Sequence, residues 1–159
     1  MTDDGRNTLP GIAQRVQKNL AFITSARNMG ADVHVVTQLL LSLLGLVIFP
    51  YEELRRQNRY ALSEISLHEL QSEGWPNWNF TISKSDSLGD LLFHVRNAIS
   101  HRRLFFSSDS RALEDVEITF RDRKTSQAPD DWAAQIPAKD LQLFVDLLSE
   151  FLADRSYSP

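Results

Sequence analysis

Residues 85–101, SDSLGDLLFHVRNAISH, are the stretch that decides the fold of this 159-residue chain. Apolar side chains recur there at intervals of three and four residues, the spacing that places them on one face of an α-helix. Ser87 and Asp90 have the spacing of a Ser-x-x-Asp capping box, and we expect the helix to begin near Ser85 or Asp86. The stretch therefore predicts an amphipathic helix whose apolar stripe packs on a core; the stripe consists of Leu88, Leu91, Leu92, Val95 and Ile99.

Helical patterns also lie on both sides of this stretch. A stripe of apolar residues predicts a first helix over residues 9–28, with Gly30 near its end. A second helix should run from an N-cap at Asp32 toward Phe49, and its apolar circumference predicts that it is the most buried element. The remaining helical segments are expected at residues 51–56 after Pro50, weakly at 62–70, and at 138–154 directly after Pro137.

The period changes from helical to alternating beyond residue 101. Val116, Ile118 and Phe120 alternate with polar residues, which is typical of a half-buried strand. Residues 104–106 are its expected antiparallel partner, across a loop at 107–115. Two strands alone are marginally stable, so this hairpin must lean on the helices. A turn is expected at residues 74–79, GWPNWN.

Length and composition fit one domain. The chain is 42% hydrophobic and long enough to bury a core without disulfides or metals. Because no repeat, low-complexity tract or long linker divides it, we expect a single domain over residues 1–159, with flexible tails at 1–8 and 155–159. The predicted fold class is mainly α: a bundle of four to five helices, with a small β-hairpin inserted before the last helix.

Charge and composition exclude several functions. A net charge of −4 argues against a protein that coats nucleic acid through bulk electrostatics. There are no cysteines and no signal-peptide pattern, so we expect a cytoplasmic protein. The most apolar stretch, residues 35–51, is interrupted by polar residues and shorter than the roughly 20 needed to cross a bilayer, so we expect no membrane contact. Residues 96–103 contain three arginines and no acid, which fits a site that grips one or two phosphates.

Arg96, Asn97 and His101 combine groups that can hold a phosphate and move a proton. Asn97 and His101 are four residues apart and share a helix face, and His94 and Asp90 extend the same line. Arg96 lies about 140° from His101 around the helix axis, so one helix does not naturally aim both groups at one phosphate. Two copies paired through this helix would bring the Arg96 of one protomer toward the His101 of the other.

The Arg-Asn-x-x-x-His pattern at residues 96–101 resembles the signature of the HEPN superfamily, whose small helical members include many metal-independent ribonucleases, toxins of toxin–antitoxin pairs and phage-defence effectors. The order of motif helix, short hairpin and final helix is similar to one HEPN subfamily. The resemblance implies a homodimer with a composite cleft, RNA as substrate, and an antitoxin or a small nucleotidyltransferase as a candidate partner. Arg102 stands where many members have glycine or a small residue, which bears on the conformation of that loop.

The resemblance and the chemistry assign roles to these side chains. RNA cleavage without a metal uses the ribose 2′-hydroxyl as nucleophile, and a base must remove its proton near neutral pH. We expect His101 to be this general acid/base and Arg96 to stabilise the phosphate in the transition state. Asn97 would orient His101 or donate to the phosphate. The expected supporting residues are Arg102 and Arg103, through attraction to flanking RNA, and His94, through a supporting, interfacial or RNA contact.

Two alternatives remain open. The chain can be a HEPN-like module that binds RNA or protein without catalysis. It can also be a purely structural bundle, in which Arg96 is an ordinary solvated arginine while His101, Arg102 and Arg103 favour the negative end of the helix dipole. Neither a cofactor nor a metal is expected: the histidines form no His-Glu-x-x-His, and Asp90 with His94 is too small a ligand set. Gly-rich phosphate loops and Gly-x-Ser-x-Gly are also missing from the sequence.

Overall fold

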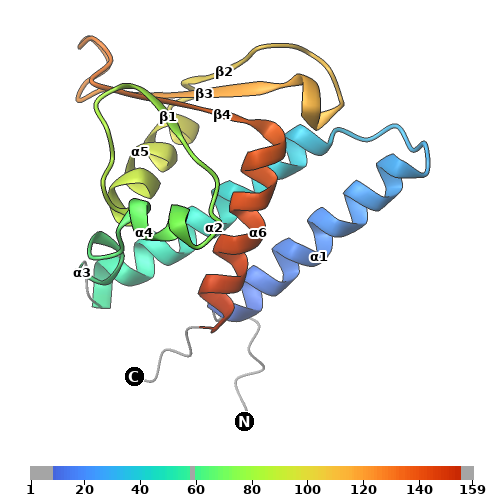
Figure 1. Ribbon diagram of the computed structural model, residues 1–159, viewed down its shortest axis with the longest axis horizontal. Coiled ribbons are helices and arrows are strands. Elements are labelled where there is room, and N and C mark those ends of the chain that lie inside the picture. Colours follow the sequence, from blue (N-terminus) through green and yellow to red (C-terminus); the bar gives the residue numbers. More distant parts are fainter. Residues whose placement is uncertain (1–8, 58–59, 155–159) are drawn as a thin grey trace.

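The computed structural model describes residues 9–57 and 60–154, and in it an antiparallel sheet lies across one end of a group of helices (Figure 1). The helices are α1 (Leu9–Asn28), α2 (Val35–Gln57), α3 (Tyr60–Ser63), α4 (Leu67–Ser72), α5 (Leu88–Ser100) and α6 (Ala138–Asp154), with a 3-10 turn η1 (Leu113–Asp115). The strands are β1 (Asn79–Ile82), β2 (Leu104–Phe106), β3 (Glu117–Asp122) and β4 (Trp132–Pro137). The segments expected to be flexible tails, 1–8 and 155–159, lie outside the described residues.

The first and last helices have the predicted bounds, and α2 differs from the prediction at both ends. α1 ends before Gly30, whose φ of +88° is a conformation that glycine adopts without strain. The N-cap predicted at Asp32 is wrong, because α2 begins only at Val35 and the Asp32 carboxylate pairs with Arg111 instead. The break predicted at Pro50 is also wrong: α2 is one helix to Gln57, and it contacts α1, α5 and α6.

Serine caps place the two helices that follow. The weak helical segment predicted at 62–70 is divided into α3 and α4, and the Ser66 hydroxyl accepts from the backbone N–H of Glu69 at the start of α4. The capping spacing predicted for α5 is confirmed, because the Ser87 hydroxyl accepts from the Asp90 N–H at 3.2 Å. The helix starts two or three residues later than predicted, since Ser85 is buried and accepts from the indole N–H of Trp132.

The sheet contains the predicted hairpin and is larger than it. β2 pairs antiparallel with β3, with Leu104 opposite Phe120 and Phe106 opposite Ile118. The hairpin is half of a four-stranded sheet in the order β1-β4-β3-β2, so the prediction of a small hairpin alone was wrong. β4 was not predicted, because Trp132, Ala133 and Ala134 are all buried. A strand covered on both faces shows no alternation of apolar and polar residues.

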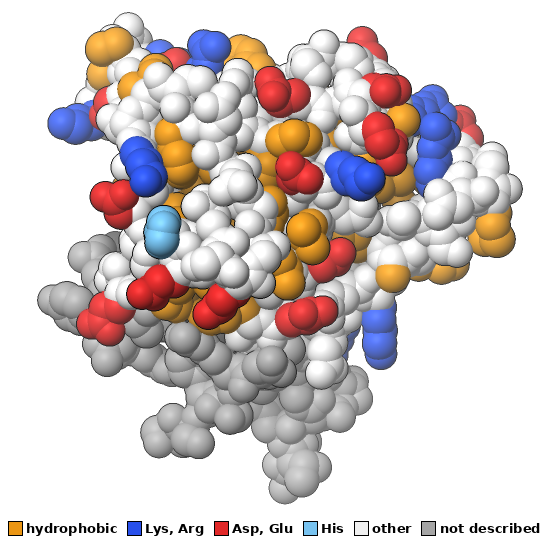
Figure 2. All heavy atoms as spheres, viewed as in Figure 1, with side chains coloured by type: hydrophobic (Ala, Val, Ile, Leu, Met, Phe, Trp, Pro, Cys, Tyr) orange, Lys and Arg blue, Asp and Glu red, His pale blue; other side chains and the backbone are white. Residues whose placement is uncertain are grey.

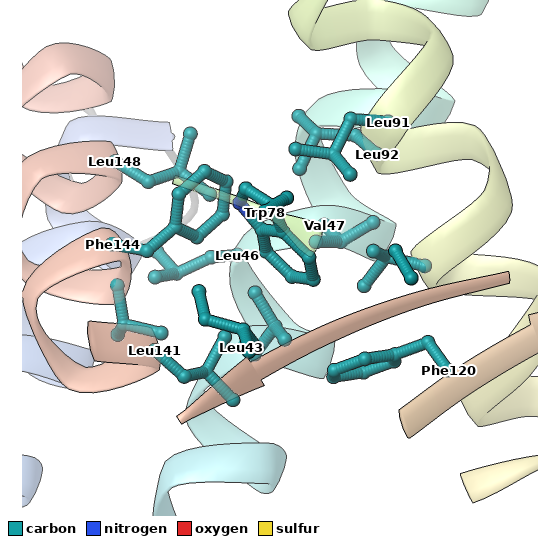
Figure 3. Close-up of a cluster of buried hydrophobic side chains, with 14 of the residues drawn as sticks. Leu43, Leu46, Val47, Trp78, Leu91, Leu92, Phe120, Leu141, Phe144 and Leu148 are labelled. Carbon is teal, nitrogen blue, oxygen red and sulfur yellow. The ribbon is translucent and has the colours of Figure 1, made fainter. Parts of the chain in front are cut away.

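The core lies between the inner face of the sheet and helices α2, α5 and α6 (Figure 3). Trp78 sits at its centre, with its ring edge-on to Phe144 at a centroid distance of 5.3 Å and tilted against Phe120 of β3. Around it Figure 3 shows aliphatic side chains from three helices: Leu43, Leu46, Val47, Leu91, Leu92, Leu141 and Leu148. This packing holds α5 against β3 and thereby determines which α5 side chains face the end of the sheet.

Candidate functional site

Helix α5 presents one apolar and one polar face. Leu88, Leu91, Leu92, Val95 and Ala98 are buried, as the predicted stripe requires, and Ile99 is partly buried. On the other side Asp90, His94 and Asn97 line one pocket. The shared polar line predicted for this helix is therefore confirmed for these three residues, whereas His101 is not among the residues that line the pocket.

A buried carboxylate, Asp122 at the end of β3, holds this polar face together. Its side chain is 6% exposed. Oδ2 accepts from the Nδ1 of His94 at 2.8 Å and from the amide of Asn97 at 3.0 Å. Oδ1 accepts from the guanidinium of Arg103 at 3.3 Å and from the backbone N–H of Arg123 at 2.8 Å. Both oxygens are thus saturated, and the Arg103 guanidinium offsets the charge of a group that would be costly to bury alone.

The His94 ring is held in a single orientation. An ionised carboxylate only accepts, so the bond to Asp122 places the proton of the neutral ring on Nδ1. The ring stacks on Trp132 of β4, with centroids 4.8 Å apart and planes 8° from parallel, and the edge of Phe93 closes another side. Nε2 lies 3.7 Å from a carboxylate oxygen of Asp90. A neutral His94 therefore keeps Nε2 as its proton acceptor, on a ring that the fold prevents from turning.

The pocket in front of His94 has a volume of about 460 Å³. α5 forms one wall, and the ends of β3 and β4 with the segment before α5 form the others. Its cationic side chains are Lys84, Arg123 and Lys124, its carboxylates are Asp90, Asp122 and Asp131, and Ser83, Phe93, His94, Asn97 and Trp132 complete the lining. A pocket of this size is in the range of small-molecule and cofactor sites.

The motif residues connect to this cluster through Asn97. The Arg96 guanidinium donates to the Asn97 side-chain oxygen at 3.3 Å, and the Asn97 amide donates onward to Asp122. One hydrogen-bonded chain therefore runs from Arg96 through Asn97 and Asp122 to His94. We call these four residues the α5 network.

His101 and its two neighbours end the helix in a Schellman turn. His101 is the C-cap, the Arg103 N–H donates to the carbonyl of Ala98 at 2.8 Å, and the Arg102 N–H donates to that of Ile99. Arg102 has a φ of +55°, the left-handed conformation that favours glycine at this position. Arg102, which stands where the sequence pattern favours glycine or a small residue, is therefore the residue that carries this strain.

The turn separates the three residues by environment. The side chains of His101 and Arg102 are exposed, and the structure describes no hydrogen bond or ion pair of the His101 imidazole. Arg103, by contrast, was expected to attract flanking RNA, and its guanidinium pairs with Asp122.

Asp122 was not among the site residues predicted from the sequence. A signal was present, since Asp122 continues the alternating buried positions of Val116, just before β3, and of Ile118 and Phe120 on β3. A carboxylate on the inner side of an alternating strand needs a partner, because burying it unpaired is costly. Trp132 was not predicted as a site residue either, and its ring stacks on that of His94.

The wider surface is electrostatically mixed. On the face seen in Figure 2, basic side chains are scattered among acidic ones and apolar patches. On α6, burial and, secondarily, the nearby Glu150 carboxylate raise the pKa of Asp146.

Within residues 9–57 and 60–154, no group of three or more histidine, aspartate and glutamate side chains is placed to hold a metal ion. No helix in that part of the chain has the length and apolarity to span a bilayer.

Comparison with known proteins places the chain in a family. A family model described as HEPN pEK499 p136 matches residues 3–157, nearly the whole chain. No curated protein and no solved structure matches it.

Proposed function

This chain belongs to the HEPN pEK499 p136 family, and we propose that it is a metal-independent endoribonuclease. The observation that carries the proposal is the hydrogen-bonded chain from Arg96 through Asn97 to the buried Asp122. It orders a motif guanidinium one turn before the helix end that His101 caps. We propose that the chain is a single cytoplasmic domain that cleaves RNA. It would act as a toxin or a defence effector, restrained by an antitoxin or a nucleotidyltransferase.

The proposed reaction is transfer of a phosphate ester within RNA. His101 removes the proton of the ribose 2′-hydroxyl, whose oxygen attacks the adjacent phosphorus. The bond from phosphorus to the 5′-oxygen breaks, and a 2′,3′-cyclic phosphate and a 5′-hydroxyl end result. Arg96 stabilises the additional charge on the phosphate, and Asn97 holds that guanidinium. The exposed Arg102 attracts flanking RNA. Because the 2′-hydroxyl is the nucleophile, DNA is not a substrate.

The site is proposed to be completed by a second copy. Phe93 and Ser100 are exposed on α5, two turns apart on the same side as Asn97. An exposed aromatic residue in the middle of such a face suits the apolar centre of an interface. Pairing two α5 helices across a two-fold axis would bring Arg96 of each protomer toward His101 of its partner.

A catalytically silent RNA- or protein-binding module is the second candidate. The observation in its favour is that no residue described in this chain orients the exposed His101 imidazole. In this case the α5 network stabilises the fold, and the arginines at the end of the motif helix bind RNA or protein without cleaving it. The two candidates differ in whether substitution of His101 changes cleavage or only binding.

Incubation of the purified protein with a broad RNA panel in EDTA tests the proposal. We expect cleavage with cyclic-phosphate ends, and no cleavage at sites with a 2′-deoxy nucleotide. His101→Ala and Arg96→Ala should each lower the rate by about 10²- to 10⁴-fold, the range of acid–base and electrostatic terms. The matched controls are His34→Ala, an exposed histidine before α2, and Arg27→Ala in the last turn of α1. An intact RNA panel, or equal rates for His101→Ala and wild type, would reject the endoribonuclease.

A further inference from the structure

We propose that His94 is a second catalytic residue, the general acid that protonates the leaving 5′-oxygen, and that Asp122 is its positioning residue. The inference rests on the proposed endoribonuclease and names the residue that completes its proton transfers. The sequence favoured a supporting, interfacial or RNA-binding role for His94 over a catalytic one. Its ring lines a pocket on the polar face of the motif helix, and this placement supports the catalytic role.

The first argument is orientation. Among the histidines of the described residues, only His94 is partly buried, with a side chain that is 19% exposed. The exposed histidines are His34, His68 and His101. Asp122 binds its Nδ1 at 2.8 Å and Trp132 stacks under the ring, so only Nε2 remains for exchange with a ligand. A fixed imidazole whose second nitrogen is held by a buried carboxylate is the arrangement by which proteins orient a proton-transfer histidine.

The second argument is charge. Once the ring carries a proton on each nitrogen, it lies between the carboxylates of Asp122 and Asp90, which are 2.8 and 3.7 Å from its two nitrogens. This environment suits a proton donor. His101 faces no such pair in the described residues and suits the acceptor role. The other charged groups of the site are Lys84 before α5, Arg103 and Arg123 beside Asp122, Lys124 after β3 and Asp131 before β4.

The third argument is spacing. His94 and His101 are seven residues apart, so their Cα atoms lie about 10 Å apart along α5 and only about 20° apart around it. A phosphodiester between them has its attacking and leaving oxygens on opposite sides. The 2′-proton goes to His101 as the bond from the 2′-oxygen to phosphorus forms. The electron pair of the breaking bond goes to the 5′-oxygen, which takes the proton from Nε2 of His94. Exchange with water then restores both rings.

A leaving group that needs no protonation tests the acid. We would compare an oligoribonucleotide with its analogue carrying a 5′-bridging sulfur, since a thiolate leaves without an acid. His94→Gln should cut the oxygen substrate about 10²- to 10⁴-fold more slowly and lose the decline in rate at high pH. It should cut the sulfur substrate within about tenfold of wild type, whereas His101→Ala stays slow on both. His34→Gln, at an exposed histidine, is the matched control.

Asp122→Asn tests the positioning role. An asparagine holds the ring less well in its Nδ1–H form, so the high-pH decline in cleavage rate should shift along the pH axis, which loss of stability alone would not cause. We again expect the sulfur substrate to restore the cleavage rate of this variant. Equal defects of His94→Gln on both substrates, or a wild-type pH profile, would overturn the inference and leave the endoribonuclease standing.

Wild-type protein provides a readout that does not depend on a variant folding. In nuclear magnetic resonance spectra of the histidine rings, uridine 3′-monophosphate should shift the His94 signals and leave those of His34 unchanged. Unmoved His94 signals at saturating nucleotide would overturn the inference. If wild-type protein cleaves no RNA, the proposed function fails and His94 loses its role with it, an outcome distinct from an active enzyme that is indifferent to His94.

Discussion

The Asn97 amide donates a 3.0 Å hydrogen bond to the buried carboxylate of Asp122, and this bond joins the motif helix α5 to strand β3. Asn97 also accepts from Arg96 at 3.3 Å, so it couples a motif guanidinium to the sheet. Asp122 in turn orders His94 and Arg103. Stability and site geometry therefore depend on the same carboxylate.

Asp122→Ala should be strongly destabilising. It leaves the Arg103 guanidinium partly buried without its carboxylate, and it removes the acceptor of His94 and Asn97. Breaking such a pair costs about 3–5 kcal/mol in the free energy of unfolding. Urea denaturation measures this cost, and Asp86→Ala, at an exposed carboxyl, should change stability by less than about 0.5 kcal/mol. The double variant Asp122→Ala, Arg103→Met should lose less than Asp122→Ala. A larger loss in the double variant would contradict the account.

Arg102→Gly should stabilise the fold and weaken RNA binding. Arg102 occupies the left-handed position of the Schellman turn with a φ of +55°, where glycine avoids the cost of the Cβ. After the entropy of glycine in the unfolded chain is subtracted, the gain should be about 0.5–1 kcal/mol. Arg102→Ala is the matched control: it should weaken RNA binding to a similar degree and give no such gain. Equal stability of the two variants in thermal unfolding would argue against strain at this turn.

The stability of the protein should carry a pH-dependent contribution from Asp146. Burial raises the pKa of this carboxyl, and the Glu150 carboxylate raises it further, so the folded state binds the proton more tightly than the unfolded chain. Stability is therefore lost as pH rises from the ordinary pKa of an aspartate to the raised one.

Asp146→Asn should remove that loss. The variant should be more stable than wild type above this window, by a modest amount because Asp146 is only partly buried, and the advantage should vanish as pH falls below it. Melting temperatures of both proteins between about pH 3 and pH 7 provide the measurement. A difference that does not change with pH would refute the assignment to Asp146.

Phe93→Glu should dissociate the proposed homodimer. Phe93 is 38% exposed on the polar side of α5, and a carboxylate placed at the two-fold axis would face its own copy. Sedimentation over a range of concentrations should show a dimer for wild type and a monomer for the variant. Phe22→Glu changes a phenylalanine that is 70% exposed on α1 and should leave the dimer intact. A dimer that survives Phe93→Glu would move the interface away from α5.

Local patterns were sufficient for the elements whose neighbours cover one face only. The bounds of α1 and α6, the capping serine of α5 and the β2–β3 pairing all follow from periodicity and short-range hydrogen bonds. Local patterns failed for β4, which is covered on both faces, and at Pro50, where α2 continues as one helix to Gln57. The motif residues were visible in the sequence, while the partner of Asn97 was not, because it lies 25 residues away on a strand.

The sequence alone determined the helical character of the chain, the amphipathic motif helix and the Arg96, Asn97 and His101 pattern, because residue spacing and residue type suffice for those. Tertiary structure alone decided that Asp122 lies against that helix, that His94 stacks on Trp132, and that Arg103 faces inward while His101 faces outward. The physical reason is that a buried carboxylate is acceptable only when the fold brings donors to it, and these donors come from α5, from the turn after it and from the backbone that follows β3.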